Sequence, residues 1–355
     1  MKVALIVTSL HRSGPSIFTR NLAIGLKRLD VDVHVFYFDD ILEIDLPVAK
    51  TRLRFWHSHD FSDYDIVHST GFRPDLYNAF FVAGKRTSCI TGIHNFLDVD
   101  LRSHYGYVKA TIGRFVWGKA IARINYLIVS SEQMKQFYRS YFGRKTVIEL
   151  IPYGIDPPVQ RATQIDSEVT TIVDSLRKRG LHLIISCGVF YKRKGFDTLI
   201  AAVAKSPNTA LLLIGDGPEM GRLTQLASHP DIIGRVVFLG TRKDSAQYYS
   251  LCDIYAHTSL SEGFGLAMIE ALAGAMPLVC SDLPIYSGFF EKDDVVRFTP
   301  SNIGSLCDAI MTCIARLSEL KITSLNLYRK HFSLDAMAER HLATYKNMAK
   351  ATARF

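Results

Sequence analysis

The stretch Ser261-Glu262-Gly263-Phe264-Gly265-Leu266-Ala267-Met268-Ile269-Glu270-Ala271-Leu272-Ala273 contains two glutamates eight positions apart. Glu262 opens a glycine-rich turn, whereas Glu270 lies in a run that is otherwise apolar and helix-forming, where a carboxylate is costly unless it meets a donor or a ligand hydroxyl. Eight residues are a little over two helical turns, so both carboxylates can face one cleft roughly 12 Å apart. This spacing suits a ligand with two separate sets of hydroxyls, such as a sugar nucleotide. The backbone N–H groups at 263–265 would favour an anion at the start of the helix.

Length and composition predict a soluble protein of two domains. A chain of 355 residues is long for one core, and its 48% hydrophobic and 21% charged residues are ordinary for globular proteins. No apolar run reaches the ~20 residues that a membrane-spanning helix needs, and the apolar start at 3–7 is too short for a signal peptide. Six cysteines without a CxxC pair favour reduced thiols in a cytoplasmic protein over a zinc site or a disulfide framework.

Short apolar segments alternate with helical patterns, which predicts an α/β fold with parallel sheets covered on both faces. The expected strands are 3–8, 33–37, 66–69, 89–93, 126–130 and 147–151, then 183–187, 210–214, 236–239, 254–256 and 278–280. The expected helices include 16–28, 73–82, 196–204, 219–226, 245–252 and 265–273, with 160–180 helical and two or three more helices after 302. The turn formers at 152–158 separate the two alternations. We therefore expect two doubly wound, Rossmann-like domains, 1–155 and 156–335, facing each other across a cleft.

A basic segment, Lys192-Arg193-Lys194, lies between Gly188 and Gly195, after a strand and before a helix. A diphosphate that joins a sugar to a nucleoside would need such donors, with arginine as a planar fork and lysine as a point charge. A solvated basic turn is the plainer interpretation.

Two other glycine motifs also end strands. In Gly215-Asp216-Gly217-Pro218 the glycines permit a sharp turn and leave room for a ligand, but the same residues can simply start a helix at Pro218. Gly240 ends a further strand, and both interpretations can hold together.

The first half offers fewer residues that point to chemistry. His94 ends an apolar strand, and although a lone histidine is more often structural, the carboxyl ends of strands face the ligand in open α/β sheets. His68 ends the preceding strand and is expected to be structural. Gly14 lies between the first strand and a helix, where backbone N–H groups can approach phosphates or an acceptor.

These motifs resemble the signature of family four glycosyltransferases, which are retaining enzymes of the GT-B fold. The similarity rests on Glu262-x7-Glu270 with Phe264-Gly265, on the later Gly274 and Pro277, and on the Lys-Gly-Phe-Asp-Thr-Leu-Ile pattern at 194–200. It covers 180–285 well and the first half loosely. It implies transfer of a sugar from a nucleotide-sugar donor of UDP or GDP type to a hydroxyl on a sugar or lipid-linked acceptor, in bacterial polysaccharide, lipopolysaccharide or glycolipid synthesis.

The resemblance also implies roles for single residues. Arg193 and Lys194 would stabilise the leaving diphosphate, Glu270 would bind ribose, and Glu262 and His94 would lie at the transferred sugar. The residues expected to bind the donor are Gly14, Gly188, Arg193, Lys194, Gly215, Gly240, Glu262, Gly263, Phe264, Gly265, Leu266 and Glu270. Val189 stands where many relatives carry arginine, so Arg193 is expected to supply that guanidinium. The last helix, within 336–355, would cross back to the first domain.

Two alternatives stay open: a sugar-nucleotide epimerase of the same fold, and a non-catalytic protein that binds sugar nucleotides. Asp98-Val99-Asp100 has the D-x-D form of metal sites, but Asp30-Val31-Asp32 shows how easily that form arises. Because cations and helix ends offset the diphosphate charge in the GT-B arrangement, we expect no obligatory metal and no cofactor besides the nucleotide-sugar co-substrate.

The segment 101–145 holds nine basic residues against Glu132 alone. Nine aromatic residues interleave with these cations: Tyr105, Tyr107, Phe115, Trp117, Tyr126, Phe137, Tyr138, Tyr141 and Phe142. An acidic acceptor or an anionic membrane surface would suit this pattern, and so would an ordinary solvated helix with core aromatics. Nucleic acid is disfavoured because no recognised binding motif accompanies the charge. We expect a cytoplasmic protein, with binding at the inner face of the cell membrane left open.

Overall fold

The computed structural model describes residues 1–352 apart from 12, 85–86, 94–96, 158–165, 243–244, 263 and 287, and only the backbone of 97–110 and 352. The chain divides into two compact units. The first unit is Met1–Ile155 with His331–Phe355, and the second unit is Asp156–Lys330. The second unit ends at Lys330 rather than at 335, because hydrogen bonds from the Ile155 N–H to the Phe332 carbonyl (3.0 Å) and from the Leu334 N–H to the Ile155 carbonyl (2.9 Å) tie the returning chain to the first unit.

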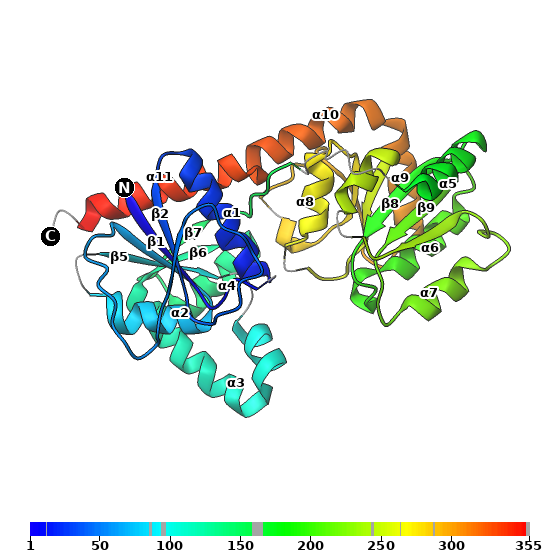
Figure 1. The fold of residues 1–355 in the computed structure, drawn as a ribbon. Helices are drawn as coiled ribbons and strands as arrows, with labels where there is room; N and C mark the ends of the chain where they lie inside the picture. Colours follow the sequence, from blue (N-terminus) through cyan, green and yellow to red (C-terminus); the bar gives the residue numbers. More distant parts are fainter. Residues whose placement is uncertain are drawn as a thin grey trace. The chain divides into compact units, whose positions relative to one another are not determined.

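The first unit is built on a seven-stranded parallel sheet with the order β3-β2-β1-β4-β5-β6-β7 (Figure 1). Its strands are β1 (Lys2–Val7), β2 (Asp32–Tyr37), β3 (Ala49–Arg52), β4 (Ile66–Thr70), β5 (Ser88–Ile93), β6 (Tyr126–Val129) and β7 (Val147–Leu150). The apolar runs predicted as strands in the first half all form strands, because helices cover both faces and reward continuous apolar sequence. The strand β3 was not predicted, since its Ala-Lys-Thr-Arg sequence is polar and mostly exposed at the sheet edge.

The helices of the first unit are α1 (Gly14–Arg28), α2 (Phe72–Tyr77), α3 (Leu97–Ile124), α4 (Glu132–Phe142) and α11 (Leu334–Thr352), with a π-helical turn, η1 (Asn78–Val82), after α2. The helix expected at 73–82 is therefore split where the backbone changes from α to π at Asn78. The C-terminal α11 packs against α1 (Figure 1). Gly25 permits this approach, because a Cβ there would lie 2.7 Å from the Cβ of Ala338.

The second unit has a six-stranded parallel sheet with the order β10-β9-β8-β11-β12-β13. Its strands are β8 (His182–Cys187), β9 (Thr209–Ile214), β10 (Val236–Gly240), β11 (Ile254–His257), β12 (Leu278–Ser281) and β13 (Val296–Phe298). Its helices are α5 (Ser167–Lys178), α6 (Phe196–Lys205), α7 (Met220–Ala227), α8 (Leu266–Ala273), α9 (Ile303–Ala315) and α10 (Leu317–Leu327), with shorter 3-10 segments η2 (Lys192–Lys194), η3 (Ser245–Leu251) and η4 (Pro284–Tyr286), and a π-helical turn, η5 (Tyr328–Phe332), at the return to the first unit.

The elements of the second unit differ from the expected ones at three places. The α-helix expected at 245–252 is the 3-10 helix η3, and β13 was not predicted because it is only three residues long. Of the helix expected at 160–180, the structure places α5 at Ser167–Lys178, and 158–165 lie outside the described residues.

Candidate functional site

The loops that follow the neighbouring strands β8 and β11 are joined by their backbones. The Leu260 N–H donates to the Arg193 carbonyl at 2.7 Å, and the Thr258 hydroxyl donates to the Lys194 carbonyl at 3.0 Å. The order of the strands reverses between β8 and β11: β9 and β10 are added on one side of β8, whereas β12 and β13 are added on the far side of β11. Such a switch point is where open parallel sheets bind ligands at the carboxyl ends of their strands. The basic segment and the first glutamate of the glycine-rich stretch are thereby held together.

Glu262 is a nearly buried carboxylate with several donors, its side chain being only 7% exposed. The Lys194 ammonium donates to its Oε1, and the Ser259 hydroxyl donates to the same oxygen at 2.7 Å. The Arg193 guanidinium lies 3.8 Å from Oε2, close enough for a charge interaction. The structure therefore brings together three of the residues predicted to act on the sugar and the diphosphate.

The ionisation of Glu262 follows from these neighbours. Burial alone would raise its pKa, but the imidazole of His257 and the ammonium of Lys194 outweigh that effect and hold the pKa well below its ordinary value. His257 Nε2 lies 3.4 Å from Oε1 without forming a hydrogen bond to any described residue. Glu262 is consequently an anion at neutral pH, able to accept hydrogen bonds but unable to donate a proton.

Sequence analysis did not identify His257 and Ser259 as partners of this carboxylate. His257 is the last residue of β11 and is buried, with 5% of its side chain exposed. The sequence did contain a signal for His257. His94 was selected because it ends an apolar strand, and His257 also ends an apolar strand. Applying that argument to the second half would have identified His257.

Glu270, the second glutamate, lies in the middle of α8 with one donor among the described residues, the hydroxyl of Tyr249 at 3.4 Å. Burial raises the pKa of Glu270, and the Tyr249 hydrogen bond opposes this only in part. A half-buried carboxylate with one long hydrogen bond is suited to accept further hydrogen bonds from a ligand's hydroxyls.

Three predicted glycines lie at the ends of three adjacent strands, β8, β9 and β10. The Gly188 N–H donates to the Ile214 carbonyl at 3.0 Å, and the Gly215 N–H donates to the Gly240 carbonyl at 2.9 Å. A Cβ on Gly215 would lie 2.0 Å from the Gly188 carbonyl oxygen, whereas a Cβ on Gly240 would meet no atom of the described residues within 4 Å. Gly215 is thus required for packing, and Gly240 leaves open space beside the backbone.

Three more predicted residues that the structure describes, Phe264, Gly265 and Leu266, lie at the start of α8. Gly265 has φ +89°, and a Cβ there would lie 3.2 Å from the Tyr286 hydroxyl and 3.5 Å from His257 Nε2. Phe264 is buried, with its ring 6.3 Å from that of Phe289, whereas Leu266 is partly exposed. Gly263 lies outside the described residues.

In the first unit, Gly14 is the first residue of α1, with Ser13 before it as the N-cap. His94 lies outside the described residues. His68 is buried and its Nδ1 shares a hydrogen bond of 2.6 Å with the Tyr345 hydroxyl of α11. Asp98 and Asp100 fall where only the backbone of α3 is described.

A buried carboxylate that sequence analysis did not identify lies between β4, β5 and α3. Asp75 accepts hydrogen bonds from the hydroxyls of Ser69 and Thr91, both at 2.6 Å, and from the indole N–H of Trp117 at 2.7 Å. Burial raises the pKa of Asp75 to about 7, although these three hydrogen bonds favour the ionised form. Asp75 fixes the carboxyl end of β5, which leads into His94.

The side chains of the segment 101–145 that the structure describes are divided between core and surface. Trp117 and Tyr138 are core residues with 3% and 0% exposure, whereas Ile112 and Phe115 are each 62% exposed. The Lys119 ammonium lies 4.4 Å from the centre of the Phe115 ring. Among the described residues, none of the helices combines the length and the apolar character that crossing a bilayer requires.

Two Rossmann-like units with parallel sheets, the second carrying cations and carboxylates at its strand ends, define a protein of the GT-B class. The family model described as Glycosyl transferases group 1 matches residues 170–318, and the one described as Glycosyltransferase Family 4 matches residues 12–158. The two matched regions together extend over most of the chain. The chain belongs to these glycosyltransferases, as its motifs predicted.

Relatives of known function agree with this assignment. The chain is 26% identical to the O-antigen biosynthesis glycosyltransferase WclY of Escherichia coli, over 98% of this chain and 99% of that protein. It is also 38% identical to the lipopolysaccharide core biosynthesis glycosyltransferase LpsE of Rhizobium meliloti, over 27% of this chain and 28% of that protein. The chain is therefore a glycosyltransferase.

Solved structures confirm the predicted GT-B fold. The structure of Anabaena HepE in complex with UDP matches with a TM-score of 0.77 at 20% identity, covering 98% of this chain and all of that one (100%). Sucrose-phosphate synthase from Thermosynechococcus elongatus matches with a TM-score of 0.73 at 20% identity, covering 99% of both chains. At this identity the similarity concerns the fold alone.

Proposed function

We propose that this glycosyltransferase takes its sugar from a nucleotide-sugar donor bound by the second unit, and transfers it with retention of configuration to a hydroxyl of a bacterial lipopolysaccharide or polysaccharide acceptor. The observation that carries this proposal is the ionised, nearly buried Glu262 beside Lys194 and Arg193 at the ends of β8 and β11. The similarity to WclY along the whole chain supports the acceptor class, and the HepE complex with UDP supports a nucleotide donor.

In this proposal the cations act on the leaving group. When the bond between the sugar carbon and the donor phosphate breaks, negative charge develops on the diphosphate. Lys194 and Arg193 are already fixed at the strand ends, so they stabilise this charge without reorganising. An oxygen of the departing diphosphate takes the proton of the acceptor hydroxyl, which attacks the same face of the sugar. No protein nucleophile is required.

The carboxylates act as hydrogen-bond acceptors. Glu262, which stays ionised because its pKa is lowered, would accept hydrogen bonds from hydroxyls of the transferred sugar. Glu270 would accept them from the ribose, and the open space at Gly240 would admit the base. His94 would lie near the reacting sugar. No metal or further cofactor is part of this proposal.

A thermal-shift measurement with UDP, GDP and ADP tests the donor site. One of these nucleotides is expected to raise the melting temperature by several degrees, because a ligand at a hundred times its Kd adds about 2.7 kcal/mol of stability. The shift should be lost in Arg193→Ala and in Glu270→Ala. It should persist in Arg316→Ala, which removes a partly buried arginine that pairs with Glu319. No shift with any nucleotide would refute the donor site.

The stereochemistry is tested separately. Once donor and acceptor are known, the anomeric configuration of the product, read by NMR, should equal that of the donor sugar. An inverted product would refute retention while leaving transferase activity intact.

We also propose that the protein works in the cytoplasm and that α3 binds the anionic inner face of the membrane. Ile112, Phe115, Lys119 and Arg123 recur at intervals of three or four residues, so they share one exposed face of α3. Apolar side chains beside cations are typical of helices that lie in the membrane interface.

Vesicle flotation tests this membrane proposal. The wild-type protein is expected to float with vesicles of phosphatidylglycerol and to stay behind with phosphatidylcholine alone. The double variant Lys119→Glu/Arg123→Glu should lose flotation, since each cation near an anionic surface contributes about 1 kcal/mol. Lys178→Glu/Lys205→Glu, in the second unit, is the matched control. Equal flotation of both double variants would contradict a role for α3.

A further inference from the structure

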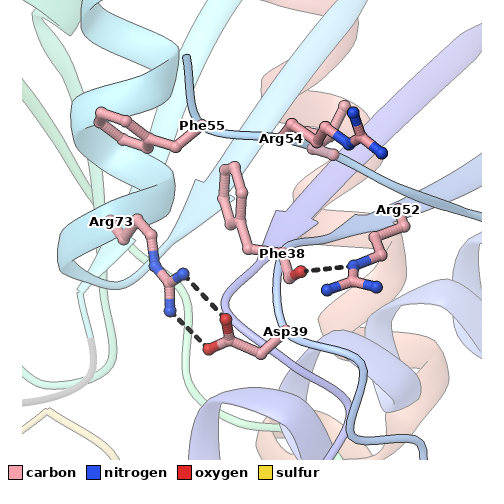
Figure 2. A pocket seen from close by; sticks show the side chains of 7 residues that line it. Phe38, Asp39, Arg52, Arg54, Phe55 and Arg73 are labelled. Carbon is pink, nitrogen blue, oxygen red and sulfur yellow. Dashed lines mark hydrogen bonds and ion pairs between the residues drawn. The ribbon is translucent and has the colours of Figure 1, made fainter. Parts of the chain in front are cut away.

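A cavity of about 530 Å³ in the first unit has no role in the chemistry described so far. Its lining residues are Phe38, Asp39, Arg52, Leu53, Arg54, Phe55 and Arg73 (Figure 2). They come from the carboxyl ends of β2 and β3 and from the start of α2. The cavity therefore lies at the carboxyl edge of the sheet, the edge where open α/β sheets bind their ligands.

The charged side chains that line this cavity are three arginines and one aspartate. Three arginines face it against Asp39, to which the Arg73 guanidinium donates two hydrogen bonds, one of 2.9 Å (Figure 2). Arg52 donates to the Phe38 carbonyl at 3.1 Å and pairs with the exposed Asp40 at 3.2 Å. The Arg54 carbonyl accepts a hydrogen bond from the His57 N–H at 3.0 Å, but its side chain is exposed and its guanidinium makes no hydrogen bond or ion pair with any described residue. The cavity thus has two fixed guanidinium groups and one with all its donors available.

The remaining walls are aromatic. The Phe38 ring is buried with the Arg73 guanidinium 5.4 Å from its centre, and Phe55 also lines the cavity (Figure 2). Trp56 follows directly, 83% exposed, with its ring 5.0 Å from that of Phe55. Aromatic surface offers an apolar face on which the C–H groups of a sugar ring can pack. Guanidinium forks beside it match the geometry of a carboxylate or a phosphate.

The backbone connects this cavity to the loop that leads into α1. The Phe38 and Asp39 N–H groups both donate to the Thr8 carbonyl, at 3.1 and 2.9 Å. The Leu10 N–H donates to the Ile41 carbonyl at 3.0 Å. Backbone hydrogen bonds therefore link the cavity's β2 wall to the residues that follow β1.

We propose that Arg52, Arg54 and Arg73 bind an oxoanion, a phosphate or a carboxylate, carried by a sugar of the acceptor. This inference rests on the proposed function, because the bound sugar is an acceptor only if the protein transfers a sugar as proposed. An acceptor with an acidic sugar would be held by this cavity, and a neutral acceptor would lack that anchor.

Calorimetric titration of the full chain tests the site directly, with glucose 6-phosphate, glucuronate, inorganic phosphate and glucose as probes. One of the two anionic sugars is expected to bind, with an affinity that falls as salt is added. Arg54→Gln should weaken binding about ten-fold or more, because it removes a charge-assisted hydrogen bond. Arg20→Gln, an exposed arginine on α1 of the same unit, should leave binding unchanged.

Three outcomes would overturn the proposal. The first is that neither anionic sugar binds at a concentration of about 10 mM, which would detect even a millimolar Kd. The second is that glucose or inorganic phosphate binds as well as the anionic sugars, which would remove either the charge or the sugar from recognition. The third is that Arg20→Gln weakens binding as much as Arg54→Gln.

The nucleotide-dependent thermal shift separates this proposal from the donor proposal. Arg54→Gln should keep that shift, which also shows that the variant is folded. If the anionic sugar binds but no nucleotide does, the oxoanion site stands and the proposed donor site fails. If a nucleotide binds but no anionic sugar does, the reverse holds.

Discussion

Replacing Lys194 with alanine is expected to lower kcat/KM for sugar transfer by about 10²–10³-fold, the range found when one preorganised donor to a developing anion is removed. Lys194 is 17% exposed, is fixed by its contact with Glu262, and is joined through its carbonyl to Thr258. The alanine variant loses the cation that would face the leaving diphosphate. Steady-state kinetics with the donor identified by thermal shift would measure the loss.

The neighbouring lysine gives a matched control. Lys192 belongs to the same 3-10 helix, but its side chain is exposed and its ammonium makes no hydrogen bond or ion pair with a described residue. Lys192→Ala removes the same charge as Lys194→Ala but no contact to Glu262. It should therefore change kcat/KM by no more than a few-fold. Equal losses in the two variants would show that the segment acts by its overall charge, and the specific role of Lys194 would be wrong.

The Glu262→Gln variant separates charge from shape at the same place. Glutamine keeps an oxygen for the Ser259 hydroxyl but leaves the Lys194 ammonium without a nearby anion. If the pair acts as a unit, the double variant Lys194→Ala/Glu262→Gln should lose little more activity than Lys194→Ala alone. Fully additive losses would indicate two independent roles.

Much of the fold could be predicted because its strands are buried on both faces. A run such as Leu183–Cys187 within β8 reads as a strand from composition alone, since a parallel sheet between two helical layers demands continuous apolar sequence. The same rule misses β3, whose polar residues are exposed at the sheet edge. It also misses the change from α to π helix at Asn78, because that depends on side-chain hydrogen bonds to β4.

The site could be predicted only as separate pieces. Lys194 and Glu262 are far apart in the sequence, and their contact depends on β8 and β11 being neighbours, which no local pattern states. Asp75 was missed although the argument that selected Glu270 applies to it, since it too is a carboxylate among apolar neighbours. The cavity was missed because Arg52 ends a polar edge strand that was not predicted, and Arg54 and Phe55 follow directly after it.

Gly195→Ala is expected to lower the free energy of unfolding of the second unit by about 2–4 kcal/mol. Gly195 has φ +66°, a left-handed conformation that costs an alanine about 1–2 kcal/mol. In addition, a Cβ at this position would lie 2.2 Å from the Thr258 carbonyl oxygen. That oxygen belongs to the backbone of the loop after β11, so it can move away only if the loop itself moves.

Gly180→Ala isolates the steric part of this cost. Gly180 also lies in the second unit with φ +74°, but a Cβ there would meet nothing within 4 Å. The two variants therefore share the conformational strain and differ in the clash, so urea unfolding should show Gly195→Ala to be the less stable. Because the clash would displace the loop that carries Ser259 and Glu262, Gly195→Ala should also lose transferase activity at temperatures where it is still folded. Equal stability of the two variants would mean that the loops after β8 and β11 are not held in this close contact.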